Sequence, residues 1–175
     1  MKKVVLRWEL LGIIFALLLG ALLHFAFDLS GEWRPLASIA AVNESVWEHL
    51  KLGFWPALIY FLIEYRYISK SSSNFLFGKA IGIFIIPVAI TVLFYAYTAV
   101  IEDILVADIM IFVVAIVVGQ LTSYKILTMS PLPSWLNRFG MVFLILLAIA
   151  FSTLTYYAPQ LPIFRDPITG GYGIQ

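Results

Sequence analysis

Long apolar runs, separated by short polar connections, make up most of this chain. Five of them, at residues 9–27, 46–65, 75–97, 104–127 and 139–157, approach the length of about 20 residues that a helix needs to cross a hydrocarbon core. Because lipid offers no water to exposed peptide groups, such runs fold as helices. The pattern predicts an all-α, polytopic membrane helix bundle with about five transmembrane helices. The short connections make successive helices antiparallel neighbours.

The composition agrees with this class and narrows the chemistry. Hydrophobic residues make up 62% of the 175 residues and charged residues 12%, against about 45–50% and about 25% in soluble domains. A net charge of +1 provides no basic surface for nucleic acid. The chain has no cysteine, which excludes disulfides, thiolate metal clusters and thiol nucleophiles. His24 and His49 are the only histidines, so an imidazole ligand can come from them alone.

Basic residues are divided unevenly between the two ends of the predicted bundle. With the N-terminus in the cytoplasm, the cytoplasmic segments hold Lys2, Lys3, Arg7, Arg66, Lys70, Lys79, Lys125 and Arg138. The opposite side holds Arg34, Lys51 and Arg165. Such an excess is typical of cytoplasmic loops. We therefore predict a multi-pass protein of the cell membrane, with a cytoplasmic N-terminus and an extracytoplasmic C-terminus. The bundle is predicted over residues 1–158, and residues 159–175 form a Pro/Gly-rich extracytoplasmic tail.

Acidic residues show the opposite distribution. Most of them share the extracytoplasmic end with both histidines: Asp28, Glu32, Glu44, Glu48, Glu102, Asp103, Asp108 and Asp166. Acids have little influence on membrane topology, so insertion does not explain this bias. Ionisable residues in membrane segments are costly and are functional candidates by default. We therefore expect a functional site at this end.

Small residues recur at every fourth position of the first helix, at Gly12, Ala16 and Gly20. Small side chains let a neighbouring helix approach closely. The same spacing continues to His24 and then Asp28. This ridge aims His24 inward near the outer surface and lets Asp28 reach the imidazole. The alternative is an interfacial histidine that serves packing alone.

The densest polar stretch, VNESVWEHLKL at residues 42–52, opens the second helix. Ser45 and Glu48 have the spacing of a capping box, in which the serine caps the third amide and the glutamate reaches back to the serine amide. This interpretation starts the helix at Val46 and lets Lys51 extend outward to the interface. The polar stretch would then be a helix cap.

Capping does not account for every polar residue in this stretch. Glu44 and Glu48 are four positions apart, and two carboxylates that close need a cation, a proton or a basic partner between them. His49 directly follows Glu48, and Asp108 lies one turn inside the fourth apolar run, although an acid near a helix end is as often interfacial. The candidate metal ligands are His24, Glu44, Glu48, His49 and Asp108. The candidate catalytic groups are Glu44, Glu48 and His49.

Three segments carry a resemblance to a known group of proteins: GALLHFAFDLSG at residues 20–31, VNESVWEHLKL at residues 42–52 and PIFRDPITGGYGI at residues 162–174. On these segments the chain is similar to small bacterial membrane proteins grouped under a domain of unknown function. The resemblance implies a five-helix integral membrane protein. It implies no catalytic role for any residue.

Three functions fit these observations, and whether the protein is an enzyme stays open. In the first, the candidate ligands bind zinc, iron or manganese, and the metal activates water against a lipid-like or membrane-bound substrate. In the second, the same acids serve a proton- or cation-coupled transporter. In the third, a non-catalytic membrane subunit docks a partner. A haem held by both histidines is a side alternative. The bilayer is the expected partner, and a homo-oligomer is left open.

Overall fold

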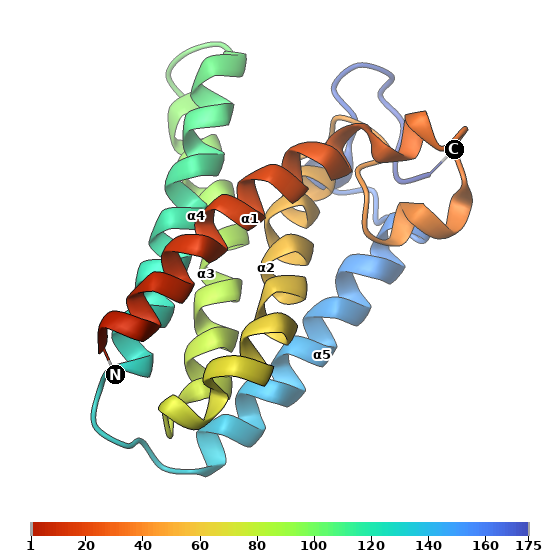
Figure 1. Ribbon diagram of the computed structural model, residues 1–175. Helices are drawn as coiled ribbons and strands as arrows, with labels where there is room; N and C mark the ends of the chain where they lie inside the picture. The colour runs from red at the N-terminus through yellow and green to blue at the C-terminus, as the bar shows by residue number, and fades with distance from the viewer. Residues whose placement is uncertain (1, 175) are drawn as a thin grey trace.

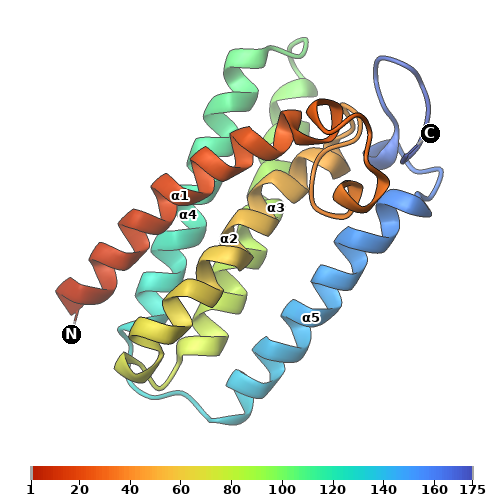
Figure 2. The same ribbon diagram turned by 45° about the vertical axis from the view of Figure 1, so that its right-hand side comes forward.

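The computed structural model describes residues 2–174 and contains, within this range, five long α-helices and no β-strand. The long helices are α1 (Lys2–Leu29), α2 (Val46–Ile68), α3 (Phe75–Thr98), α4 (Leu105–Leu127) and α5 (Trp135–Tyr156). Three short 3-10 helices lie between and after them: η1 (Arg34–Ser38), η2 (Ser69–Ser71) and η3 (Pro162–Phe164). The long helices form one bundle with the two termini at opposite ends (Figures 1 and 2). The predicted all-α class is confirmed.

The helix boundaries follow the apolar runs closely. α2 and α3 begin at Val46 and Phe75, as predicted. α1 begins seven residues before the first apolar run, at Lys2 rather than residue 9, because the preceding Lys, Arg and Leu residues are good helix formers. α5 begins at Trp135 instead of residue 139, because its first helical turn, which includes the polar residues Asn137 and Arg138, precedes the apolar run.

Four of the helices, α1, α3, α4 and α5, are long and apolar enough to cross a membrane, which indicates a multi-pass membrane protein. The prediction of five such helices is corrected at α2, which carries Glu48, Lys51, Glu64 and Arg66. α2 is the internal helix, in contact with α1, α3 and α5 (Figures 1 and 2). Neighbouring helices shield it from lipid, so polar side chains on it can be paired inside the bundle.

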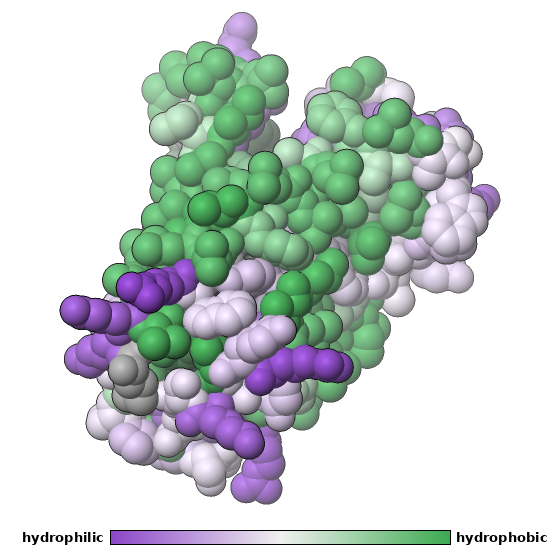
Figure 3. All heavy atoms as spheres, in the orientation of Figure 1, coloured by the Kyte–Doolittle hydropathy of each residue, from purple (hydrophilic) through white to green (hydrophobic). Residues whose placement is uncertain are grey.

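The outer surface of the bundle is apolar. Figure 3 shows hydrophobic residues over most of the visible face and hydrophilic ones gathered at the lower end, where α1 begins. Large exposed apolar side chains include Leu18, Leu22 and Phe25 of α1, Val114 and Val118 of α4, and Ile145 and Ile149 of α5. An exposed apolar surface of this extent is compatible with a lipid bilayer.

Glycine allows the close approach of α1 and α2. A Cβ atom on Gly20 would lie 2.6 Å from the backbone oxygen of Leu52, so only glycine fits this contact without a shift. Ala16, one turn earlier, is completely buried. The expected close contact along the small-residue ridge is therefore present. It brings the last two turns of α1 against the first turns of α2.

The residues after α5 fold back over the ends of α2 and α5 (Figure 1). The Asn43 amide donates to the Gly173 oxygen at 2.9 Å, and the Ile174 amide donates to the Thr155 oxygen at 3.0 Å. Trp47 packs against Phe164, with ring centroids 4.6 Å apart. The tail therefore holds the loop before α2 in place.

Candidate metal centre

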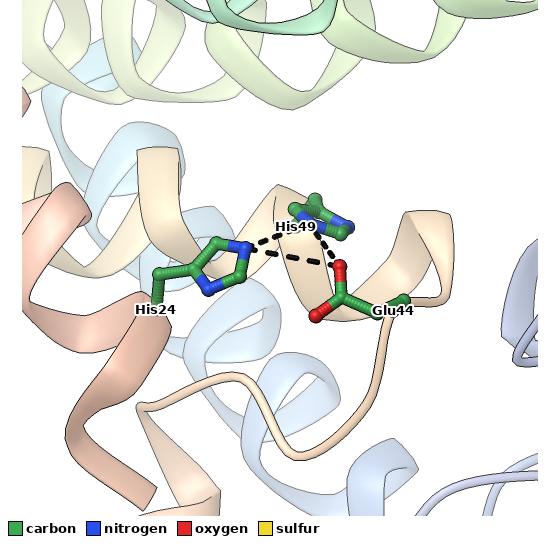
Figure 4. A group of neighbouring side chains, drawn as sticks. All are labelled: His24, Glu44 and His49. Atoms are coloured by element: carbon green, nitrogen blue, oxygen red, sulfur yellow. Dashed lines mark hydrogen bonds and ion pairs between the residues drawn. The ribbon is translucent and has the colours of Figure 1, made fainter. Parts of the chain in front are cut away.

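Three side chains from separate segments converge at one end of the bundle, which we call the histidine end. His24 comes from α1, Glu44 from the loop before α2, and His49 from the first turn of α2 (Figure 4). Their ligand atoms face one another. The two Nε2 atoms are 3.3 Å apart, and Glu44 Oε2 lies 3.4 Å from His49 Nε2 and 3.8 Å from His24 Nε2. This group could hold a metal ion.

The loop before α2 places Glu44 by local hydrogen bonding. The Ser45 hydroxyl accepts from the Glu48 amide at 3.4 Å, which confirms the predicted N-cap and the helix start at Val46. The other half of the predicted capping box is wrong. The Ser45 amide donates to Asn43 Oδ1 at 2.9 Å instead of to Glu48. An asparagine turn therefore precedes the helix, and Glu44 lies between the turn and the cap.

The tautomer of His49 is fixed by its own helix turn. His49 Nδ1 is 3.0 Å from the Ser45 carbonyl oxygen, which can only accept. Nδ1 therefore carries the proton, and in the neutral ring Nε2 presents a lone pair toward His24 and Glu44. A histidine that ligates a metal is held in this way, with the second ring nitrogen donating to a carbonyl or carboxylate.

The three groups present more electron pairs than protons. The Nε2 lone pair of His49 and the Glu44 carboxylate both point into the group, and a proton on His24 Nε2 would satisfy only one of them. When His49 Nε2 also carries a proton it donates to Glu44, and this hydrogen bond holds the pKa of Glu44 below its ordinary value, so the carboxylate is ionised at neutral pH. The side chains of His24, His49 and Glu44 are 29%, 35% and 44% exposed, so an ion can reach them.

Glu48, a predicted metal ligand and catalytic group, lies apart from this group. Its side chain is 1% exposed, and Oε2 pairs with Lys51 Nζ at 2.5 Å while Oε1 accepts from the Thr155 hydroxyl at 2.9 Å. The Val42 amide also donates to Oε2, at 3.1 Å. All of its charge is used inside the bundle, so the geometry gives no support to a metal role for Glu48.

Lys51 corrects a second expectation, because it does not extend outward. It is completely buried and donates to the Ala37 oxygen at 2.7 Å and to the Thr155 hydroxyl at 2.8 Å. The i,i+3 spacing of Glu48 and Lys51 is a sequence signal for their ion pair. No sequence signal indicates Thr155, which belongs to α5.

The Asp108 carboxylate accepts a hydrogen bond from a residue outside the three-residue group. The Tyr97 hydroxyl lies 2.6 Å from Asp108 Oδ1 and 2.7 Å from Asp103 Oδ1. The charges of Asp108 and His49 still act on each other. Asp108 is therefore a neighbour of the three-residue group and not one of its members.

Asp28 does not contact His24 in the described residues, contrary to expectation. It lines a small cavity of 190 Å³ together with Asn43 and Asp166. Successive members of the ridge differ by about 40° in direction, and no hydrogen bond or ion pair joins Asp28 to His24 in the described residues.

A haem held by both histidines is not compatible with this arrangement. The ring centroids of His24 and His49 are 5.2 Å apart and their Nε2 atoms 3.3 Å apart. No porphyrin plane fits between two nitrogens that close.

The chain belongs to the family of unknown function DUF6512, whose family model matches residues 1–174. Comparison with curated proteins and with solved structures found no match. The expected membership of a family of unknown function is confirmed, and the bacterial source stays a prediction. Function therefore has to be argued from the geometry of the site.

Proposed function

We propose that His24, Glu44 and His49 bind a divalent transition metal, with zinc as the best fit, and that the protein is a membrane-embedded metal-dependent hydrolase. The observation that carries this proposal is the spacing of the three ligand atoms. At metal–ligand distances of about 2.0–2.2 Å, two ligands of a tetrahedral site lie roughly 3.3–3.6 Å apart. Two of the separations here, 3.3 and 3.4 Å, fall in this range, and the third, 3.8 Å between His24 and Glu44, is slightly longer.

The ligand set suits a catalytic centre better than a structural one. Structural zinc sites are closed by four protein ligands, whereas catalytic sites have three and keep one position for water. Two imidazoles and a carboxylate are also a ligand set of iron(II) enzymes, so the metal is an outcome of the test. A metal held by these residues would lower the pKa of a bound water to about 7 and so supply hydroxide at neutral pH.

A substrate would approach between the histidine end and the neighbouring ends of α3 and α4, which carry Tyr97 and Asp108. Figure 3 shows the surface hollowed between the lobe of α3 and α4 and the lobe of the α1–α2 connection and tail, with apolar residues on its walls. The site lies on elements that border this hollow. An apolar hollow at the end of a membrane bundle favours a lipid-like or membrane-bound substrate, whose polar group would reach the metal-bound water.

Elemental analysis of the purified protein tests the metal. We expect stoichiometric divalent metal in the wild type and its loss in His24→Ala and His49→Ala, because each removes a nitrogen ligand. Asp28→Asn is the matched control, since Asp28 lies one turn from His24 without contacting it. A folded wild-type protein that takes up no divalent metal after incubation with zinc, iron(II) or manganese would refute the site.

Hydrolysis is tested on the metal-loaded protein in vesicles. Ester and phosphoester substrates are offered in lipid-anchored and in water-soluble form, and turnover is compared between wild type and His49→Ala. We expect metal-dependent cleavage of lipid-anchored substrates. A loaded protein that cleaves none of them retains its metal site but is not a hydrolase of this class.

Transport is the second candidate, because a further set of charged residues lies buried toward the other end of the bundle. Between the two sets of charged residues, large apolar side chains fill the middle of the bundle. They include Phe54, Ile86 and Ile116, each at most 1% exposed. Metal flux into proteoliposomes distinguishes transport from hydrolysis. Metal accumulation that His49→Ala abolishes would favour transport.

A further inference from the structure

Three charged side chains meet inside the bundle near the end where α1 begins, which we call the N-terminal end. Glu9 of α1, Glu64 of α2 and Lys79 of α3 are 0%, 0% and 2% exposed. Lys79 Nζ lies 2.7 Å from Glu9 Oε1 and also pairs with Glu64 Oε2. We call these three residues the acidic triad.

The two carboxyl groups have unequal environments. Glu9 Oε1 accepts from Lys79 and, at 3.0 Å, from the Ser123 hydroxyl of α4. Glu64 is paired with Lys79 alone. Glu9 Oε2 and both oxygens of Glu64 are buried without a hydrogen-bond partner in the described part of the chain, although Glu64 Oε2 forms the ion pair with Lys79. Tyr60 is the other titratable group that faces the triad, and its hydroxyl already donates to the Trp8 oxygen at 2.7 Å.

The charges of the acidic triad do not balance. Two ionised carboxylates and one ammonium leave one uncompensated negative charge inside a low-dielectric bundle. A buried charge without a partner costs several kcal/mol, and two carboxylates that share one site do not both stay ionised without further compensation. α4 contributes the neutral Ser123 hydroxyl, and no titratable group of α5 reaches the triad in the described structure.

A single proton corrects the imbalance. It neutralises the triad as a whole and supplies a donor where three buried acceptor oxygens have no hydrogen bond. Glu64 is the better proton carrier, because Glu9 already receives two donors that stabilise its charge. Glu64 and Lys79 lie four residues inside the ends of α2 and α3, about 6 Å along the helix axis from those ends.

We propose that Glu9, Glu64 and Lys79 form a proton-binding site that holds one exchangeable proton, carried by Glu64. This site is separate from the metal centre and does not depend on it. Its release leaves a net negative charge between α1, α2 and α3, so deprotonation weakens the packing of these helices.

Infrared spectroscopy of the protein in vesicles tests the proposal, because a protonated carboxyl group has a C=O stretch distinct from that of a carboxylate. We expect a protonated-carboxyl band in the wild type at neutral pH that decreases as the pH rises. Glu64→Gln removes the band, since glutamine imitates the protonated acid. Glu9→Gln removes it as well, because the remaining Glu64–Lys79 pair is balanced. Lys79→Met strengthens it, since both acids then need protons.

The controls separate the triad from other acids. Glu32→Gln, at an exposed acid of the histidine end, leaves the band unchanged. Circular dichroism verifies that each variant is helical. If Lys79→Met does not fold, the two Gln variants still test the proposal, because glutamine has the shape of the native side chain. The proposal fails if the wild type has no such band at neutral pH, or if the band persists in both Gln variants. A band that appears only when sodium is removed would assign the site to a monovalent cation instead.

Discussion

The two ends of the bundle each bring carboxylates together inside or beside the bundle, but they differ in exposure and in how the negative charge is compensated. At the histidine end, His24, Glu44 and His49 gather electron-pair donors without a cation, and each side chain is partly exposed. At the N-terminal end, Glu9 and Glu64 enclose a cation of the chain itself, and solvent is excluded. An open set of donors suits an ion from outside, whereas a closed set with one surplus carboxylate suits a proton. The kind of ligand thus follows from exposure and charge count together.

A buried ion pair with balanced charge lies beside the candidate metal centre. It is the reference with which the two ends can be compared. Glu48 and Lys51 are buried to 1% and 0% exposure, with one negative and one positive charge. Thr155 bonds both of them. This pair needs neither a metal nor a proton, and we expect it to serve stability.

Removing one member of the balanced pair gives the largest expected effect. Lys51→Met leaves the Glu48 carboxylate buried without a cation and destabilises the protein by about 3–5 kcal/mol. The double variant Glu48→Gln/Lys51→Met removes both charges and recovers most of this loss. Thermal or denaturant unfolding in detergent measures both. If Lys51→Met is as stable as the wild type, Glu48 is not held as a buried carboxylate.

The second largest effect is expected from a change at the contact of α1 with α2, which positions the ligands of the candidate metal centre. Gly20→Ala places a Cβ atom where the Leu52 oxygen lies 2.6 Å away, so α1 has to move. We expect a destabilisation of about 1–3 kcal/mol and a weaker metal affinity, since His24 moves away from His49. Ala21→Val, on an exposed position of the same turn, is the control. Competition with a chromophoric chelator measures the affinity, and an unchanged value in Gly20→Ala would show that α1 does not set the ligand spacing.

The sequence predicts the helices well because a bilayer imposes the length and the apolar character of each run. It also places Val46 and its cap, since Ser45 is a local signal. Burial of single charges is less predictable, because it depends on which helices are neighbours. The sequence alone therefore predicts Lys79 in a cytoplasmic segment and Lys51 at the interface, although both lie inside the bundle.

The composition of the candidate metal centre was predictable only in part, for the same reason. Helical spacing brings His24 to the inward side of α1, and the polar stretch supplies Glu44 and His49. Spacing alone cannot separate Glu44 from Glu48, since the choice depends on Thr155 and Lys51 inside the bundle. Asp108 has a suitable depth, but its position beside Tyr97 follows from the packing of α3 with α4.

The two ends of the bundle respond to pH in opposite directions. The smallest and most local of the expected effects is the release of the tail at low pH. Burial alone would raise the pKa of Asp166, but hydrogen bonds from the Thr169 hydroxyl at 2.6 Å and from the Ile168 amide hold it below the ordinary value of 3.8. Because the folded protein lowers this pKa, Asp166 stabilises the folded tail above about pH 3.8 and this contribution is lost as the pH falls further. Deprotonation of the acidic triad instead weakens the N-terminal end as the pH rises.

Limited proteolysis by an acid-active protease, followed over a decreasing pH series, measures the release of the tail. We expect cleavage after α5 to accelerate below about pH 3.8 in the wild type, and to be fast and nearly independent of pH in Asp166→Asn, because asparagine cannot provide the charged acceptor. Glu32→Gln serves as the control, since Glu32 is exposed. Equal cleavage profiles for wild type and Asp166→Asn would mean that the tail is held by Asn43 and the Trp47–Phe164 contact and not by Asp166.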